Sequence, residues 1–259
     1  MARVLILLPP SEGKHGPARG RPLDLATLGS PELDAPRRQA LDALVEVSGS
    51  PAAARILGLG SSQASELLRN TRLRTAPAAR ADRIYTGVLY DALSLATLDP
   101  AARRRATRQV AIVSALFGLV RPDDRIPAYR LSGGVALPGL GTVAGHWRVP
   151  LGPAVRGALG SGLLVDLRST TYAAFWRPGP DLARRTATVR VLQESDGQRS
   201  VVSHFNKATK GRLVRSLLEA GAAPRTPTAL AAALHDLGWR VEAAPAHQGT
   251  RLDVVVGQV

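Results

Sequence analysis

The amino-acid sequence predicts an α/β fold (mixed α+β) with a central mixed sheet. Three short apolar runs lack the alternation of half-exposed strands, which is typical of strands buried on both faces. These runs span residues 3–8, 110–114 and 163–169. The β-prone segments 186–193 and 199–205 flank the turn signal Asp196-Gly197, which predicts an antiparallel hairpin. Segments with helical spacing separate the strands, so helices are expected to cover the sheet.

Composition limits the classes of protein to which the chain can belong. Its 259 residues suffice for one substantial core or for two small domains that share an interface. No apolar run approaches the roughly 18 residues of a membrane span, so we expect an untargeted cytoplasmic protein with no membrane partner. The chain contains no cysteine, which excludes disulfides, thiolate nucleophiles and cysteine-ligated metals.

The charge balance is that of a protein with a polyanionic partner. The formal net charge is +14, from 34 basic and 20 acidic residues, and nucleic acid is the obvious candidate. An arginine-rich composition spread over helix faces gives the same charge without such a partner. Only three basic residues are lysines, Lys14, Lys207 and Lys210. A desolvated lysine can lose its proton, so these are candidates for phosphate binding, base or Schiff-base chemistry, unless they are surface lysines left by chance.

The first apolar run leads into a loop, residues 9–14, that carries Lys14. The loop ends in Gly-Lys, as a phosphate-binding P-loop does, but Leu8 and His15 occupy positions where that motif needs glycine and serine or threonine. What remains is a lysine at the carboxyl end of a strand, where ligand sites gather in α/β sheets.

Residues 31–47 and 52–57 have helical spacing, and the turn after them matches a helix-hairpin-helix pattern. In that motif glycines let the turn approach the DNA backbone, and free amides at the start of the second helix bind phosphate. An ordinary helix-helix turn with a glycine C-cap and a serine N-cap gives much of the same spacing. The residues of this candidate DNA-binding element are Arg55, Gly58, Leu59, Gly60, Ser61 and Arg69.

The stretch of residues 114–131 joins the end of a buried strand to a stiff polar loop. Pro122 and Pro127 fix their own φ and bias the preceding residues toward extended conformations, so the side chains of the loop have fixed directions. Tyr85 precedes a helix over residues 88–96 and can present its hydroxyl to a ligand, although such a tyrosine is more often a half-buried core residue. The candidate site residues in the stretch are Ser114, Arg121, Asp124, Tyr129 and Arg130.

Two later segments add polar candidates. Asp166 and Ser169 lie where the third apolar run ends, so the acid is either paired with an arginine or part of a site. Lys207 and Lys210 lie three residues apart near the start of a helix that continues to residue 220. Cations at a helix N-terminus oppose the helix dipole, which indicates an anion that offsets them.

The remaining expected elements close the fold. Helices are expected at 101–108, 142–147, 150–159 and 226–237, and strands near 239–243 and 252–256. The five histidines show no metal-ligand spacing, and no Gly-x-Ser-x-Gly nucleophile motif is present. The sequence therefore predicts neither a metal nor another cofactor.

Together these segments resemble the YaaA peroxide-stress family over nearly the whole chain. The N-terminal loop departs from the Ser-Pro-Ala-Lys form of better-known members. The matching residues are 7–14, Tyr85-Thr86-Gly87, 114–131 with its Gly118-Leu-Val-Arg-Pro and Pro127-Ala-Tyr-Arg core, Val165-Asp-Leu with Tyr172, and Ser203 with Lys207, Lys210-Gly-Arg and Arg215.

The resemblance implies a single compact domain over residues 1–259, with a small helical insertion at about 31–75. It also implies a positively charged cleft, a helix-hairpin-helix element that binds DNA, and protection from oxidative damage by limiting free intracellular iron. Under this hypothesis the protein binds the DNA backbone with low sequence specificity in the peroxide stress response.

Two other hypotheses remain open. The chain could be an enzyme acting on a small anionic or phosphorylated substrate, with Lys207 or Lys210 as nucleophile or base and Arg121 and Arg130 binding the anion. Alternatively, the polar clusters are structural ion-pair networks, which accounts for the acids better than for the three lysines.

Overall fold

The computed structural model describes residues 4–195, 198–200 and 203–257. Its strands, in chain order, are β1 (Val4–Leu8), β2 (Ala79–Arg80), β3 (Val110–Ser114), β4 (Gly118–Val120), β5 (Arg125–Ile126), β6 (Ala136–Leu137), β7 (Gly141–Thr142), β8 (Leu163–Asp166), β9 (Thr186–Ser195), β10 (Gln198–Ser200), β11 (Arg240–Ala246) and β12 (Gly249–Val256).

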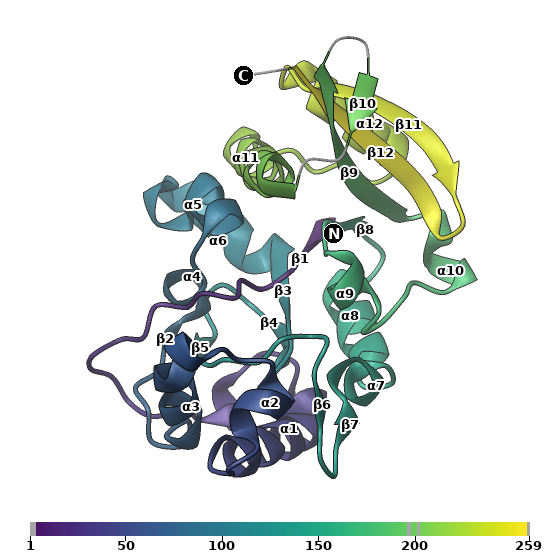
Figure 1. Ribbon diagram of the computed structural model, residues 1–259. Coiled ribbons are helices and arrows are strands. Elements are labelled where there is room, and N and C mark those ends of the chain that lie inside the picture. Colours follow the sequence, from purple (N-terminus) through teal and green to yellow (C-terminus); the bar gives the residue numbers. More distant parts are fainter. Residues whose placement is uncertain (1–3, 196–197, 201–202, 258–259) are drawn as a thin grey trace.

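The helices alternate with these strands along the chain (Figure 1). The α-helices are α1 (Asp34–Ser48), α2 (Ala53–Leu57), α3 (Ala64–Thr71), α4 (Ala81–Ile84), α5 (Val88–Leu93), α6 (Pro100–Gln109), α7 (Val143–Trp147), α8 (Leu151–Leu159), α9 (Thr170–Ala173), α10 (Pro180–Ala183), α11 (Ser203–Ala220) and α12 (Pro227–Asp236). Short 3₁₀ helices are η1 (Leu25–Thr27), η2 (Pro31–Leu33), η3 (Ser61–Gln63) and η4 (Leu95–Thr97).

The predicted mixed sheet is confirmed. Its strands follow the order β11-β12-β9-β8-β1-β3-β4, and β10 pairs with the C-terminal end of β9. The strands from β12 to β3 run parallel to their neighbours, whereas β11, β4 and β10 are antiparallel to theirs. All residues of β1, β3 and β8 are buried, which is why these strands read as continuous apolar runs.

Helices cover the sheet on both sides (Figure 1). Helices α6 and α11 pack against β1, β3 and β9, and α8 packs against β1 and β4 from the other side. Helix α11 lies so close to α5 that a Cβ added at Gly211 would be only 2.3 Å from the carbonyl oxygen of Leu89. Only glycine allows this approach between the two helices.

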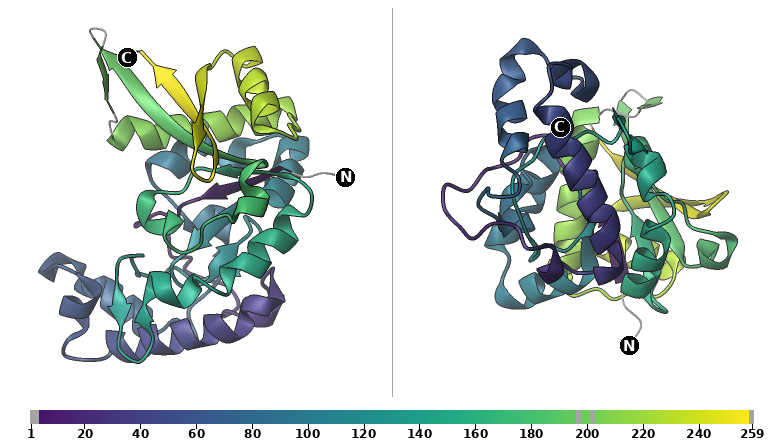
Figure 2. Two further views of the ribbon diagram at one scale, coloured as in Figure 1. Left: turned by 90° about the vertical axis from the view of Figure 1, so that its right-hand side faces the viewer. Right: turned by 90° about the horizontal axis from the view of Figure 1, so that it is seen from below.

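Helices α1, α2 and α3 form one end of the molecule, opposite the C-terminal strands (Figure 2). Arg37 of α1 is fully buried, and its guanidinium donates hydrogen bonds to the carbonyl oxygens of Gly29, Phe117 and Leu119. This arginine ties α1 to strand β4 and to the turn before it.

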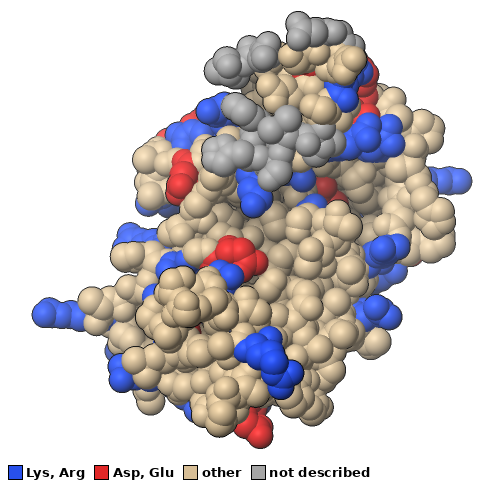
Figure 3. Space-filling model, in the orientation of Figure 1, with Lys and Arg blue, Asp and Glu red and all other residues tan. Residues whose placement is uncertain are grey.

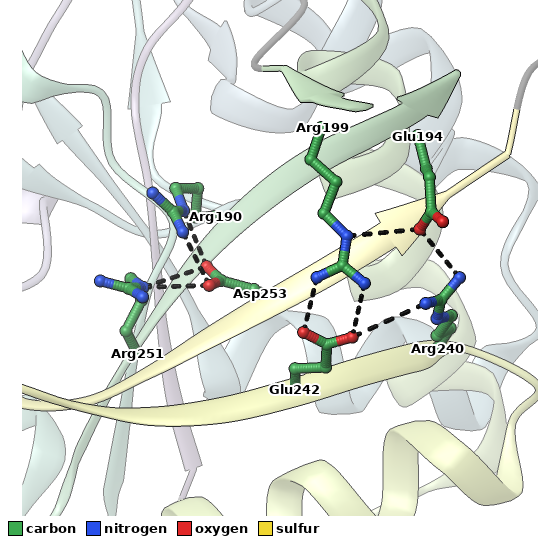
Figure 4. A network of polar contacts seen from close by, with 7 residues as sticks. All are labelled: Arg190, Glu194, Arg199, Arg240, Glu242, Arg251 and Asp253. Carbon is green, nitrogen blue, oxygen red and sulfur yellow. Dashed lines mark hydrogen bonds and ion pairs between the residues drawn. The ribbon is translucent and has the colours of Figure 1, made fainter. Parts of the chain in front are cut away.

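Seven charged residues on the C-terminal strands form two cross-strand ion-pair clusters (Figure 4). Arg190 and Arg251 both bind the carboxylate of Asp253. Arg199 of the short strand β10 binds Glu242 of β11 at 2.7 Å. Glu194 and Arg240 complete the second cluster. These pairs stabilise the register of four strands at the end of the sheet.

The predicted antiparallel hairpin is confirmed, because β10 pairs with the end of β9, but its second strand is shorter than the predicted residues 199–205. β10 ends at Ser200, and α11 already begins at Ser203. The β-branched residues in this segment favour a strand, but packing of α11 along α5 decides the conformation from Ser203 onward. The predicted turn at Asp196-Gly197 lies outside the described residues.

In the part of the chain that the structure describes, no helix combines the length and the apolar character needed to cross a bilayer.

Candidate functional site

The carboxyl ends of β1, β3 and β8 meet at one edge of the sheet, and the segments after them form the candidate site. Leu7 of β1 pairs with Ala111 of β3 and with Asp166 of β8, so the three strands end side by side. This is the edge at which α/β sheets place their ligands. The loop of residues 9–14 with Lys14, the end of β3 with Ser114, and the start of α9 all lie here.

Lys14 is held against two aromatic rings. Its Nζ lies 4.1 Å from the centroid of the Tyr129 ring and 5.7 Å from that of Tyr85. The same nitrogen donates hydrogen bonds to the carbonyl oxygens of Ser11, at 2.7 Å, and Glu12, at 3.4 Å. Burial lowers the pKa of Lys14 to about 7, against the opposing effect of the Glu12 carboxylate. A substantial fraction of this amine is therefore neutral at neutral pH.

A chain of hydroxyl groups runs from β3 to the tyrosines beside Lys14. The Oη of Tyr129 lies 2.7 Å from Ser114 Oγ and 3.1 Å from Tyr85 Oη. Ser114 Oγ already accepts hydrogen bonds from the amides of Leu116 and Phe117. Since both of its lone pairs are taken, Ser114 donates to Tyr129, and Tyr129 donates to Tyr85. Burial raises the pKa of Tyr85 to about 12 and that of Tyr129 well above its usual range, so both stay protonated.

All four tyrosines of the chain gather at this site. The Tyr90 ring stacks on Tyr85 with centroids 5.4 Å apart, and its hydroxyl donates to the carbonyl oxygen of Pro9 at 2.7 Å. Burial raises the pKa of Tyr172, while a hydrogen bond from the amide of Gly133 opposes that rise. The phenolic oxygens of Tyr90 and Tyr172 are thus engaged with the main chain, and their rings face a cavity.

This cavity has a volume of about 390 Å³ and opens beside the tyrosines. Its walls are residues 9–13, 86–90, 169, 171 and 172, with Ser132 and Lys207. Two candidates from the sequence, Ser169 and Lys207, therefore line it. Within residues 4–195, 198–200 and 203–257, the hydroxyl groups of four lining residues have no hydrogen-bond partner; they are Thr86, Ser132, Ser169 and Thr171.

Arg130 connects the cavity loop with α3. Its guanidinium binds the carboxylate of Glu12, a cavity residue, at 3.0 Å. The main chain of Arg130 exchanges two hydrogen bonds of 2.8 Å with the side chain of Asn70, which is fully buried. The helix that follows the candidate DNA-binding turn is therefore directly joined to the cavity loop.

Asp166 and Lys210 lie in a polar cluster at the end of β8. Asp166 forms a bidentate ion pair with Arg168, and both side chains are buried. The Arg168 guanidinium lies 5.7 Å from the centroid of the Trp176 ring. Lys210 Nζ donates to the carbonyl oxygen of Leu167 at 3.1 Å, and burial lowers its pKa, against the opposing effect of Asp166. Asp166 is thus paired with an arginine, which is the first of the two interpretations that the sequence allowed for this residue.

Arg121 and Asp124 lie away from this cluster. β4 runs back antiparallel to β3, with Val120 opposite Ile112, so Arg121 lies toward the start of β3 and not at its carboxyl end. There its guanidinium donates to the carbonyl oxygen of Arg108 at 3.0 Å. Asp124 accepts from the amides of Arg121 and Gly29, which oppose the raising effect of burial on its pKa. Neither residue lines the cavity.

The candidate DNA-binding turn connects α2 to η3 and α3. Gly58 ends α2 in the left-handed region, with φ +64°, and Leu59 is buried in the core. A Cβ added at Gly58 or Gly60 would meet no atom within 4 Å, so both glycines face open space. Ser61 is exposed, as is Arg55, whereas Arg69 pairs with Glu66 at 2.7 Å.

Basic side chains on the face drawn in Figure 3 occupy many separate positions, and the surface is hollowed near the middle of that face. Among the described residues, no three histidine, aspartate or glutamate side chains are placed to hold a metal ion.

Several residues of the site were not singled out from the sequence. Arg168 could have been found, because it follows Asp166 by two residues at the end of a strand. Asn70, Glu12 and Tyr90 give no such signal, since their partners lie 60 to 118 residues away in the chain. The concentration of all tyrosines in one place was also not visible from their spacing.

Comparisons with known proteins give one consistent result. A sequence model described as peroxide stress protein YaaA matches residues 4–244. A UPF0246 protein of Streptomyces coelicolor is 53% identical over 261 aligned residues, covering 99% of this chain and 100% of that relative. A UPF0246 protein of Corynebacterium efficiens is 45% identical over 220 residues, covering 83% and 84% of the two chains. One from Corynebacterium glutamicum is 38% identical over 257 residues, covering 97% and 100%.

Proposed function

Because this chain belongs to the family of the peroxide stress protein YaaA, we propose that it acts in the peroxide stress response by binding the DNA backbone. The turn formed by residues 58–62, between α2 and α3, is the proposed contact surface. The observation that carries this proposal is the outward orientation of its two glycines, which leaves the main chain open to close approach.

The amides of the turn can bind phosphate. In the described part of the chain, the amides of Ser61 and Ser62 donate no hydrogen bond. Burial of Leu59 anchors the turn, so the amides are held in place before DNA binds. Backbone amides of this kind contact phosphate oxygens without reading the base sequence.

Charge around the turn supports the same proposal. Arg55 and Arg72 are exposed, and neither pairs with a carboxylate among the described residues. Each arginine that neutralises a phosphate releases a counterion, so the affinity is expected to fall steeply as salt increases.

Fluorescence anisotropy of labelled duplex and single-stranded DNA, at about 50 and 200 mM salt, tests the proposal. We expect Gly60→Glu to weaken binding by about tenfold, which corresponds to roughly 1.4 kcal/mol of added repulsion. Gly60 has φ −78° and no neighbour within 4 Å of an added Cβ, so the substitution introduces charge without backbone strain.

Gly157→Glu is the matched control. Gly157 is exposed on α8, and a Cβ added there also meets no atom within 4 Å, so the variant adds the same charge elsewhere. Equal effects of the two substitutions, or binding that does not respond to salt, would remove the turn from the DNA contact surface.

A second candidate function is that of an enzyme acting on a small anionic or phosphorylated substrate. The observation that favours it is the cavity at the strand ends, next to the partly neutral amine of Lys14 and lined by Lys207. A pocket with perturbed titratable groups at this edge of the sheet is typical of catalytic sites. Saturable binding of a small anion, weakened by Lys207→Ala, is the first result that this candidate requires.

A further inference from the structure

We infer that the cavity beside Tyr90 and Tyr172 binds one nucleotide unit, a base with its sugar and one phosphate. The unit can come from a free nucleoside monophosphate or from an unpaired position in a DNA strand. The inference deepens the second candidate function and rests on its premise that the ligand is anionic. The cavity volume of about 390 Å³ lies within the range of roughly 300–1,000 Å³ for small-molecule sites.

One part of the cavity wall suits the flat face of a base. Pro9, Pro10 and Leu89 contribute apolar surface, and Tyr90 and Tyr172 contribute aromatic rings. The hydroxyl of Tyr90 is bound to the main chain of Pro9, so the ring and not the hydroxyl is offered to a ligand. Stacking of a base on an aromatic side chain contributes about 1–3 kcal/mol in single-strand-binding proteins.

Another part of the wall offers hydrogen bonds that the fold does not use. Thr86, Ser132 and the pair Ser169 and Thr171 come from three different segments, and in the described part of the chain none of their hydroxyl groups has a partner. A hydroxyl both donates and accepts, so these groups can satisfy the mixed donors and acceptors of a sugar and a base edge. A ligand that is only apolar would leave all four unpaired.

Lys207 is the proposed contact for the phosphate group. Its side chain is exposed at the cavity and pairs with no carboxylate among the residues that the structure describes. Glu12, the acidic residue of the lining, is already bound by Arg130 at 3.0 Å. The cation is therefore available to an anionic group, and a lysine binds phosphate as a point charge.

Isothermal titration calorimetry of the whole protein with the four deoxynucleoside monophosphates tests the inference. Separate titrations with deoxyadenosine and with inorganic phosphate measure the affinity of the protein for each part of the ligand. We expect a nucleotide to bind at least about tenfold more tightly than either part, since both regions of the wall contribute. Inorganic phosphate binding as tightly as every nucleotide would reduce the site to an anion site and overturn the inference.

Two pairs of variants locate the binding. Thr171→Val is expected to weaken nucleotide binding about fivefold or more, whereas Thr170→Val, the exposed neighbour outside the lining, leaves it unchanged. Lys207→Ala is expected to weaken it about tenfold, and Arg212→Ala, which removes a charge from an exposed position of the same helix, leaves it unchanged. Equal effects within either pair would place the nucleotide outside the cavity.

A strand containing 2-aminopurine at an unpaired position distinguishes the two sources. A change of fluorescence on binding, reduced by Thr171→Val but not by Thr170→Val, identifies a base of the strand as the ligand. Calorimetric binding without that change identifies the free nucleotide. The absence of both signals would overturn the inference. Gly60→Glu should leave nucleotide binding intact, so failure of the DNA contact and failure of the cavity are seen separately.

Discussion

The amine nitrogen of Lys14 lies 4.1 Å from the centre of the Tyr129 ring, where burial lowers the pKa of Lys14 to about 7. The unfolded chain binds the Lys14 proton up to its ordinary pKa near 10.5, so between these values the unfolded state holds more protons. We predict that the free energy of unfolding rises from about pH 7 toward pH 10, by at most about 1.4 kcal/mol per unit for one proton.

The rise ends near pH 10 because the tyrosines act in the opposite direction. The pKa values of Tyr85 and Tyr129 are raised in the folded state, so the unfolded chain loses their protons first and stability falls again. Urea denaturation followed by circular dichroism across this range measures both limbs. Lys14→Met should make the rising limb shallower and keep the falling one, since Lys210, whose pKa burial also lowers, retains its own share of the rise; an unchanged rising limb would show that Lys14 does not contribute to it.

Tyr129→Phe should destabilise the protein by about 1–3 kcal/mol, because it leaves the buried hydroxyl of Ser114 without its acceptor. Tyr90→Phe is the comparison, since it removes one hydrogen bond to the partly exposed main chain of Pro9 and should cost about 1 kcal/mol or less. Guanidinium denaturation of both variants shows which substitution lowers the free energy of unfolding more. A smaller loss for Tyr129→Phe would contradict the proposed direction of the hydroxyl chain.

Gly118→Ala should be far more damaging than Gly58→Ala. Both glycines are left-handed, with φ +70° and +64°, so both substitutions carry a backbone cost of about 1–2 kcal/mol. At Gly118 the new Cβ would also lie 2.6 Å from the buried ring of Trp147, and such overpacking adds about 1–3 kcal/mol. Thermal unfolding compares the two. Equal losses of stability would show that the main chain around Gly118 can shift to make room for the new Cβ.

Arg168→Met should cost about 3–5 kcal/mol, since it leaves the Asp166 carboxylate buried without its bidentate partner. Arg156→Met breaks an exposed pair with Asp181, which solvent screens, and should cost far less. Denaturation curves of the two variants give the difference directly. Similar small losses would mean that Lys210 or water compensates the acid.

Burial on both faces made the central strands predictable. Val4–Leu8 and Val110–Ser114 are nearly or wholly apolar, and runs of this length are too short for a core helix and too apolar for a surface loop. The start of α11, from Ser203 onward, was mispredicted because the surrounding residues favour a strand locally. This helix depends on contacts with α5, more than one hundred residues earlier in the chain. No local pattern carries that information.

The positions of candidate site residues were predictable where these residues follow the carboxyl ends of adjacent parallel strands. Lys14 and Ser114 follow parallel neighbours, so their proximity follows from the sheet. Arg121 could not be placed, because a three-residue strand beginning at Gly118 reverses the chain and takes that side chain toward the other end of β3. The assignment of functions to the cavity residues and to the turn at Gly58 stays a prediction.

The central position of β1 has a consequence for synthesis of the protein on the ribosome. Leu7 pairs with Asp166, so the β1–β8 ladder must wait while roughly 160 further residues are added, about 8–30 s at ~5–20 residues per second. During that time the five apolar residues of β1 lack at least one of their two neighbouring strands, because β3 is synthesised before β8. The nascent chain is therefore expected to need shielding by a chaperone, and closure of the sheet becomes a late event in folding.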